Sequence, residues 1–286
     1  MEPARCLVSD RRTAIDQQPR GRAVIDAAYA SWALLSRDLR AVSRSRSQLY
    51  SSLLFPLMLL ALLGTGVSSG LAPTSPRILN GDYTSYLAPG MIAMTALFSS
   101  TFSSAGFYRD RESGLLRAML ASPHSAQTIL FGKALGAILI GTVQALAVLV
   151  LAVVIPGIDL AWQFGWLGGV ATVVVTILAL NFMLSGISLL LAVRIKTMQG
   201  FHLIMNLVLF PLFFLSGAFF PLDQVPTWLE VIGYINPLTY AVDLLHYASY
   251  ADSPDGLIGP LIDGLVLGGL AMLLFVFGLR RAPRAV

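Results

Sequence analysis

Six long apolar stretches dominate the chain from residue 49 onward. Each approaches the roughly 20 apolar residues that an α-helix needs to cross the hydrocarbon core of a bilayer. None contains a cluster of charged residues. The pattern therefore predicts an all-α, polytopic integral membrane protein with six transmembrane helices. The predicted spans are Leu49–Gly66, Tyr86–Phe107, Thr128–Val153, Trp166–Val193, Gly200–Phe220 and Gly259–Leu279.

A segment with apolar and basic residues on opposite helical faces precedes the first stretch. Arg37, Arg40 and Arg44 fall opposite an apolar stripe when the segment is read as a helix. We predict an amphipathic helix over residues 24–48 that lies in the headgroup boundary, after a flexible cytoplasmic tail over residues 1–23. A frayed tail is the alternative. The apolar stripe comprises Ala28, Trp32, Leu35, Leu39 and Val42.

The segment between the fifth and sixth stretches, residues 221–258, is too apolar to be an ordinary loop. Thr227 followed by Glu230 fits a capping box. Asn236 before Pro237 supplies an N-cap residue and a proline at the first helical position. The segment therefore predicts two short helices at the external end. They run from Trp228 to about Gly233 and from Pro237 to about Tyr247.

Composition indicates the class of protein, and the distribution of charge indicates how the chain is oriented in the membrane. The chain is 56% hydrophobic and only 12% charged, about half the charged share of soluble domains, which excludes a water-exposed globular protein. Of its 19 lysines and arginines, all except Arg77 lie on one side of the predicted spans. The positive-inside rule then places both termini, including the tail over residues 280–286, in the cytoplasm. We expect a bacterial inner membrane, and no nucleic acid partner because the basic residues flank apolar spans.

Several kinds of chemistry are missing from the sequence. It has no G-x-x-x-x-G-K-[ST] phosphate loop, so we do not expect the chain to hydrolyse ATP itself. The three histidines are far apart and Cys6 is the single cysteine, so we predict no metal site, no catalytic residues and no cofactor bound by this chain. Charged residues inside the spans are almost absent, which disfavours an ion-coupled carrier.

Neutral polar and aromatic side chains within the spans are the candidates for a substrate path. Gln144, Asn181 and Asn206 are able to hydrogen-bond in a medium without water. Phe213 and Phe214 belong to an aromatic run that would accept varied apolar shapes. The alternatives are hydrogen bonds between helices for the polar residues and lipid-facing packing for the aromatic ones.

Two loop motifs resemble the ATP-binding-cassette type-2 permease family, the membrane subunits of bacterial exporters for drugs, lipids and polysaccharides. The longer motif runs over residues 215–222 and continues at residues 225–229 and 236–243. The shorter motif, Arg111–Arg117, precedes Ser122-Pro123 and the third span, like the coupling loop of the family. The sequence departs from the family pattern at Leu115, where threonine is frequent, and at His246, where arginine is common.

The resemblance implies a six-span permease domain over residues 49–279 that pairs with a second copy or a paralogue. The pair would dock on two separate ATPase subunits, which bind ATP and Mg. Coupling residues would lie in the cytoplasmic loop 109–127, and gate residues in the external segment 221–258. The implied coupling residues are Glu112, Gly114, Leu115, Leu116, Arg117 and Pro123. The implied gate residues are Phe220, Pro221, Trp228, Asn236, Pro237, Tyr240 and Asp243.

The coupling motif also has a physical interpretation of its own. Four apolar residues would form one side of a short helix that seats in a groove of the ATPase, while Glu112 and Arg117 would fix its register by charged hydrogen bonds. A solvated loop is the alternative. The four apolar residues are Leu115, Leu116, Met119 and Leu120.

The scarcity of charge in the spans favours a hydrophobic or amphipathic cargo, such as a drug or lipid, that an exporter moves outward. A polysaccharide or glycolipid exporter is the main alternative. A secondary carrier and a membrane scaffold without transport are weaker alternatives, because the sequence lacks intramembrane acids and catalytic constellations.

Overall fold

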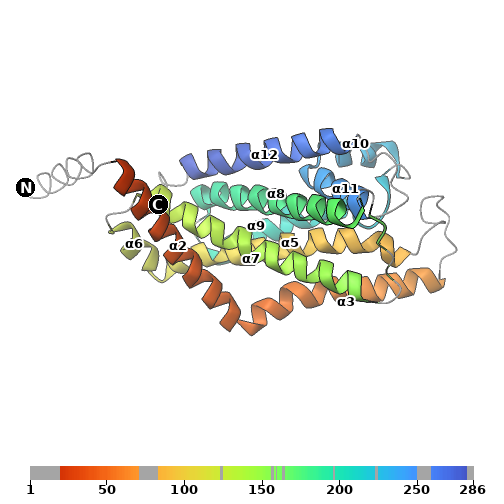
Figure 1. The fold of residues 1–286 in the computed structure, drawn as a ribbon, viewed down its shortest axis with the longest axis horizontal. Coiled ribbons are helices and arrows are strands. Elements are labelled where there is room, and N and C mark those ends of the chain that lie inside the picture. The colour runs from red at the N-terminus through yellow and green to blue at the C-terminus, as the bar shows by residue number, and fades with distance from the viewer. Residues whose placement is uncertain are drawn as a thin grey trace, which may run out of the picture.

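The computed structural model describes residues 20–70, 83–122, 125–155, 158, 160–162, 165–195, 197–222, 225–249 and 259–281. Every regular element within these residues is helical, which confirms the all-α prediction (Figure 1). The elements are α2 (Arg20–Arg44), α3 (Arg46–Gly70), α5 (Tyr83–Glu112), α6 (Leu115–Leu120), α7 (Ala126–Val154), α8 (Gly165–Arg194), α9 (Met198–Phe214), α10 (Thr227–Ile235), α11 (Pro237–Ser249) and α12 (Pro260–Arg281).

Three of the described helices, α7, α8 and α12, are long and apolar enough to cross a membrane. α9 and the Ser52–Gly66 part of α3 are apolar but shorter. α5 has 30 residues, but its serines and threonines make it more polar. Thr95 and Thr101 of α5 donate hydrogen bonds to carbonyl oxygens one turn earlier, which satisfies these buried hydroxyls inside the helix. The number of six spans stays a prediction.

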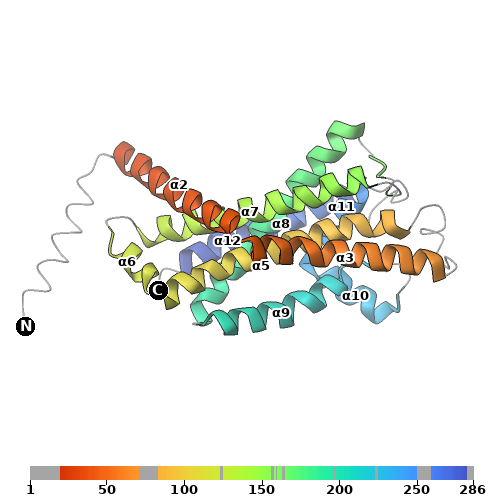
Figure 2. The same cartoon turned by 90° about the horizontal axis from the view of Figure 1, so that it is seen from below.

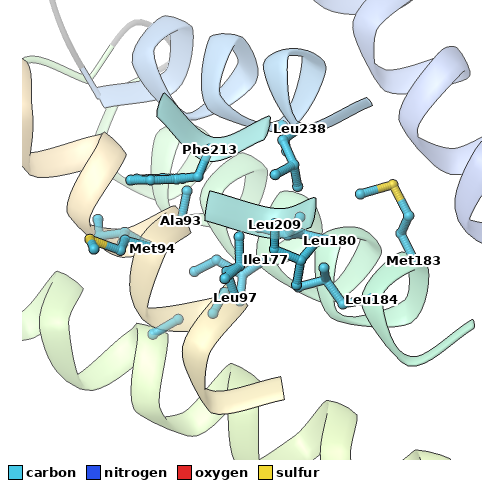
Figure 3. Packing of buried hydrophobic residues seen from close by; sticks show 14 of the residues in the cluster. Ala93, Met94, Leu97, Ile177, Leu180, Met183, Leu184, Leu209, Phe213 and Leu238 are labelled. Carbon is cyan, nitrogen blue, oxygen red and sulfur yellow. The ribbon is translucent and has the colours of Figure 1, made fainter. Parts of the chain in front are cut away.

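α5 is the central helix of the bundle. It packs against α3, α7, α8, α9 and α11, and its residues from Ser85 to Leu97 are all buried. Apolar side chains of α5, α8, α9 and α11 meet around it (Figure 3). Those labelled in the figure are Ala93, Met94 and Leu97 of α5, Ile177, Leu180, Met183 and Leu184 of α8, Leu209 and Phe213 of α9, and Leu238 of α11.

α2 is inclined to the bundle and packs against the first half of α7 (Figure 2). Gly132 of α7 permits this approach, because a Cβ atom there would lie only 3.0 Å from the Ser31 Cα atom, whereas one at Gly136 would make an ordinary contact of 3.5 Å with the Asp38 Cβ atom. The residues of the predicted apolar stripe of α2 therefore differ in their exposure. Leu35 is buried, whereas Trp32 is 67% exposed. The helix itself is present, and its place at the headgroup boundary stays a prediction.

The segment after α9 differs from the prediction in two details. α9 ends at Phe214, not Phe220, because the chain turns there and Gly217 adopts a left-handed conformation with φ of 85°. Thr227 was expected to cap α10, but it is the first helical residue, and the N-cap is Pro226 without a side-chain hydrogen bond. The predicted cap of α11 is confirmed, because the Leu238 N–H donates to Asn236 Oδ1 at 3.0 Å.

α8 and α12 approach so closely that only glycine fits between their backbones. A Cβ atom at Gly186 would lie 2.6 Å from the Phe275 nitrogen. We predict that Gly186→Val lowers the free energy of unfolding by about 1–3 kcal/mol, because the helices must separate to admit the side chain. Thermal unfolding in detergent measures this. Gly268→Val is the matched control, since a Cβ there meets nothing within 4 Å; equal melting temperatures for both variants would contradict the prediction.

Candidate functional site

A cluster of four charged side chains joins α2, α5 and α7 near the end of α5 that precedes α6. The Lys133 ammonium group of α7 is buried, forms an ion pair with the Asp110 carboxylate of α5, and lies 3.5 Å from Asp38 Oδ2 of α2. Arg37 of α2 reaches the same Asp110 oxygen at 2.6 Å and its neighbour Asp38 at 2.8 Å. We call these four residues the charge cluster. Their formal charges sum to zero.

The electrostatics of Asp110 follow from this arrangement. Burial raises the pKa of its carboxyl group, but the hydrogen bonds and positive charges of Lys133 and Arg37 outweigh that effect. The pKa therefore lies below the ordinary value of 3.8, and Asp110 stays ionised at neutral pH. Arg37 was expected on the open face of α2; its side chain is instead partly buried against α5.

The turn between α5 and α6 is attached to two more helices. The Met198 N–H at the start of α9 donates to Glu112 Oε1 at 2.8 Å, and Arg111 donates to the Ala192 carbonyl of α8 at 3.3 Å. Gly114 adopts φ of 75°, a left-handed conformation that other residues enter at a cost. These contacts tie the end of α5, just before the turn, to the end of α8 and the start of α9.

α6 is the short helix that the coupling motif predicts, but its apolar residues do not share one free face. Leu116 is buried in its own chain with 1% exposure, whereas Leu115 is 42% exposed. Arg117 is exposed, and Met119 and Leu120 are half-buried. Pro123, the last of the implied coupling residues, lies outside the described residues.

The implied gate residues gather at the opposite end of the bundle. Asn236 is buried and donates to the Leu212 carbonyl at 2.5 Å, which ties the start of α11 to α9. Tyr240 donates to the Tyr234 carbonyl at 2.7 Å. Trp228 is 65% exposed on α10. Of the remaining gate residues, Pro221 is buried, and Phe220, Pro237 and Asp243 are half-buried.

Two side chains outside the implied set also join this end to α5. The Tyr86 hydroxyl donates to the Gly217 carbonyl at 2.8 Å. His246 of α11 is buried, with Nε2 lying 3.0 Å from the Tyr86 carbonyl oxygen and Nδ1 lying 3.0 Å from the Val242 carbonyl oxygen. The histidine that departs from the family pattern therefore joins α11 to α5.

The candidate path residues do not converge. Gln144 is buried and accepts hydrogen bonds from Ser52 at 2.9 Å and from Ser99. Asn181 is buried and donates to the Ile177 carbonyl of its own helix at 3.0 Å and to the Thr142 hydroxyl of α7 at 3.4 Å. Their positions inside one bundle fit the alternative of hydrogen bonds that hold helices together. Phe213 is buried, whereas Asn206 and Phe214 are exposed on α9. In the part of the chain that the structure describes, no group of three or more His, Cys, Asp or Glu residues is placed to hold a metal ion.

Sequence reasoning missed the charge cluster and the bridging role of His246. The signal for the cluster was faint: Lys133 lies near the start of the third predicted span, and Asp110 just after the second. A lysine and an aspartate at adjacent span ends are able to pair only if the helices bring them to one level. That condition depends on packing.

Comparison with known proteins identifies one matching family model and several related proteins. The family model described as ABC-2 type transporter matches residues 29–250, from α2 to just beyond α11. The "Putative transport permease ycf38" of Cyanophora paradoxa is 30% identical over 218 residues, which cover 75% of this chain and 72% of that protein. The "Probable multidrug ABC transporter permease YbhR" of Escherichia coli (strain K12) is 30% identical over 166 residues, 58% of this chain but only 44% of that protein. "Nodulation protein J" of Rhizobium leguminosarum bv. viciae is 28% identical over 182 residues, 63% of this chain and 68% of that protein.

Removal of the central carboxylate should destabilise the protein. We predict that Asp110→Asn lowers the free energy of unfolding by about 3–5 kcal/mol, because it leaves the buried Lys133 ammonium group without its nearest counter-charge. Chemical unfolding in detergent measures the change. Adding Lys133→Met should restore part of the loss, since both buried charges are then gone. Glu230→Gln is the control, because Glu230 forms no ion pair within the described residues; a loss as large in the control would contradict the assignment.

The same carboxylate predicts a pH dependence. Because the folded-state pKa of Asp110 is lowered, its contribution to stability is complete above the ordinary value of 3.8 and is lost as the pH falls through the lower folded-state value. Unfolding of the native protein and of Asp110→Asn, followed from pH 7 into the acid range below pH 3.8, should give curves that stay apart at neutral pH and approach each other as the pH falls below 3.8. Curves that stay parallel over this range would overturn the prediction.

Proposed function

Because the chain belongs to the ABC-2 type transporter family, whose members are membrane permease subunits, we propose that it exports a hydrophobic or amphipathic substrate while a separate subunit hydrolyses ATP. The observation that carries the proposal is the family match over residues 29–250, which spans both the α5–α6 turn and the α10–α11 segment. The Escherichia coli relative, named as a multidrug permease, supports a drug-like cargo. A polysaccharide or glycolipid cargo is the second candidate.

The arrangement of basic residues supports a cytoplasmic location for the α6 end. Arg111 and Arg117 lie on the segment at that end, and the C-terminal end of α12, with Arg280 and Arg281, lies at the same end in Figure 1. Basic residues on one side of the membrane are typical of the cytoplasmic face. On this proposal α3, α5, α7, α8, α9 and α12 are the six spans in a bacterial inner membrane, and both termini are cytoplasmic.

α6 is the proposed contact with the ATPase pair, on which two permease chains would sit. Arg117 is exposed and able to pair with an acidic group of the partner, while Leu116 already packs inside this chain. Glu112 would transmit movement through a contact within this chain. Its carboxylate accepts a hydrogen bond from the Met198 N–H and so attaches the end of α5 to α9. ATP and Mg would be bound by the partner alone.

The direct test is copurification with the candidate ATPase, followed by ATP hydrolysis in lipid nanodiscs with a panel of drugs and lipids. Stable association and substrate-stimulated hydrolysis would support the exporter and narrow its cargo. No association with any ATPase of the same organism would overturn the proposal and favour a carrier or a scaffold.

Two variants test the coupling role of the α5–α6 turn. We predict that Arg117→Glu and Glu112→Ala each reduce ATP-dependent transport about tenfold at normal membrane abundance, because hydrogen bonds to charged groups contribute about 1.5–3 kcal/mol. Arg40→Glu is the matched control for charge reversal, since Arg40 is exposed on α2. Leu116→Asp is unsuitable, because it places a carboxylate in the core. Transport equal to that of the native protein in both test variants would remove the coupling assignment.

A further inference from the structure

We propose that the groove between α2, α5 and α7 binds an anionic phospholipid, with its phosphate at Arg109 and an acyl chain directed toward the middle of the bundle. The site rests on the proposed membrane orientation, which places the α6 end at the cytoplasmic leaflet. The groove has a cavity volume of about 320 Å³, within the range of about 300–1,000 Å³ that is typical of ligand pockets. Its lining combines charged and apolar residues from three helices and from Leu115 of α6.

The charge of the groove favours an anion. Arg37, Asp38, Asp110 and Lys133 all line it, but these four charges compensate one another within the charge cluster. Arg109 lines the same groove, is exposed, and has no counter-ion among the described residues. One uncompensated guanidinium group at the rim matches a singly charged phosphodiester, which it is able to bind through two parallel hydrogen bonds.

The charges and the apolar residues occupy different depths. Phe102 lies seven residues before Arg109 on α5, about 10 Å deeper along the helix. Ile140 lies seven residues beyond Lys133 on α7, again about 10 Å toward the middle of the bundle. Because α5 and α7 run in opposite directions, both apolar residues lie on the same side of the charges. This order fits a phospholipid whose headgroup lies at the rim of the groove and whose acyl chain extends into it.

A hydroxyl group lies next to the apolar level, because Ser103 follows Phe102 on α5. Ser103 lines the groove, and its buried Oγ atom has no hydrogen-bond partner among the described residues. A buried hydroxyl without a partner is costly in an apolar environment. An ester carbonyl of a phospholipid, which lies between the phosphate and the acyl chain, would accept this hydrogen bond.

Gly106 offers a way to fill the groove without disturbing the fold. It lines the groove on α5, and a Cβ atom there would meet nothing within 4 Å. Gly106→Leu therefore places an apolar side chain where the lipid would lie. Gly268→Leu is the matched control, since Gly268 of α12 is equally open but lies outside the groove. Arg109→Gln removes the rim charge, and Arg40→Gln, at an exposed arginine of α2 outside the groove, is its control.

The experiment is native mass spectrometry of the purified permease alone, after incubation with equal amounts of phosphatidylglycerol and phosphatidylcholine. We expect the native protein and both controls to retain phosphatidylglycerol about fivefold better than phosphatidylcholine, and Gly106→Leu and Arg109→Gln to lose this preference. Equal retention of the two lipids by the native protein, or an unchanged preference in either test variant, would overturn the proposal. Since no ATPase is present, the result is independent of whether the chain is an exporter.

Discussion

The Lys133 ammonium group lies inside the helix bundle, and a buried positive charge is stable there only with a counter-charge beside it. Asp110 supplies that charge from α5, and Arg37 and Asp38 complete the cluster from α2. The arrangement holds three helices at one level. It also helps to place the α5–α6 turn, because α5 ends two residues after Asp110. All four residues of the charge cluster also line the groove between α2, α5 and α7.

Neutral hydrogen bonds hold the opposite end of the bundle together. Asn236 ties α11 to the end of α9, and His246 and Tyr86 connect α5 with α11 and with the turn after α9. Such bonds matter more where water is scarce, since a buried carbonyl or amide group without a partner is costly. This end is therefore a structured cap over the bundle and not a set of loops, even though α10 leaves Trp228 exposed.

α5 connects the two ends as one helix from Tyr83 to Glu112. The first turns of α5 contact α11 and the turn after α9. Its last turns carry Asp110 of the charge cluster and Glu112, which contacts α9. In an exporter driven by a separate ATPase, a displacement of the α5–α6 turn would reach both α9 and the cap through this helix. α8 and α12 are likewise joined by the close backbone contact at Gly186.

The sequence alone determined the helical class, most helix positions, the Asn236 cap and the family, because apolar length, capping residues and short motifs are local properties. It did not determine which residues face inward. A helix that is apolar all round carries no periodic signal for its buried face, so Gln144 and Asn206 looked equivalent, although one lies in the core and the other on the surface. Only the tertiary structure brought Arg37 to Asp110, 73 residues away, and His246 to Tyr86, 160 residues away. Such contacts depend on how closely the helices approach and at what relative height, and both follow from the packing of the whole bundle.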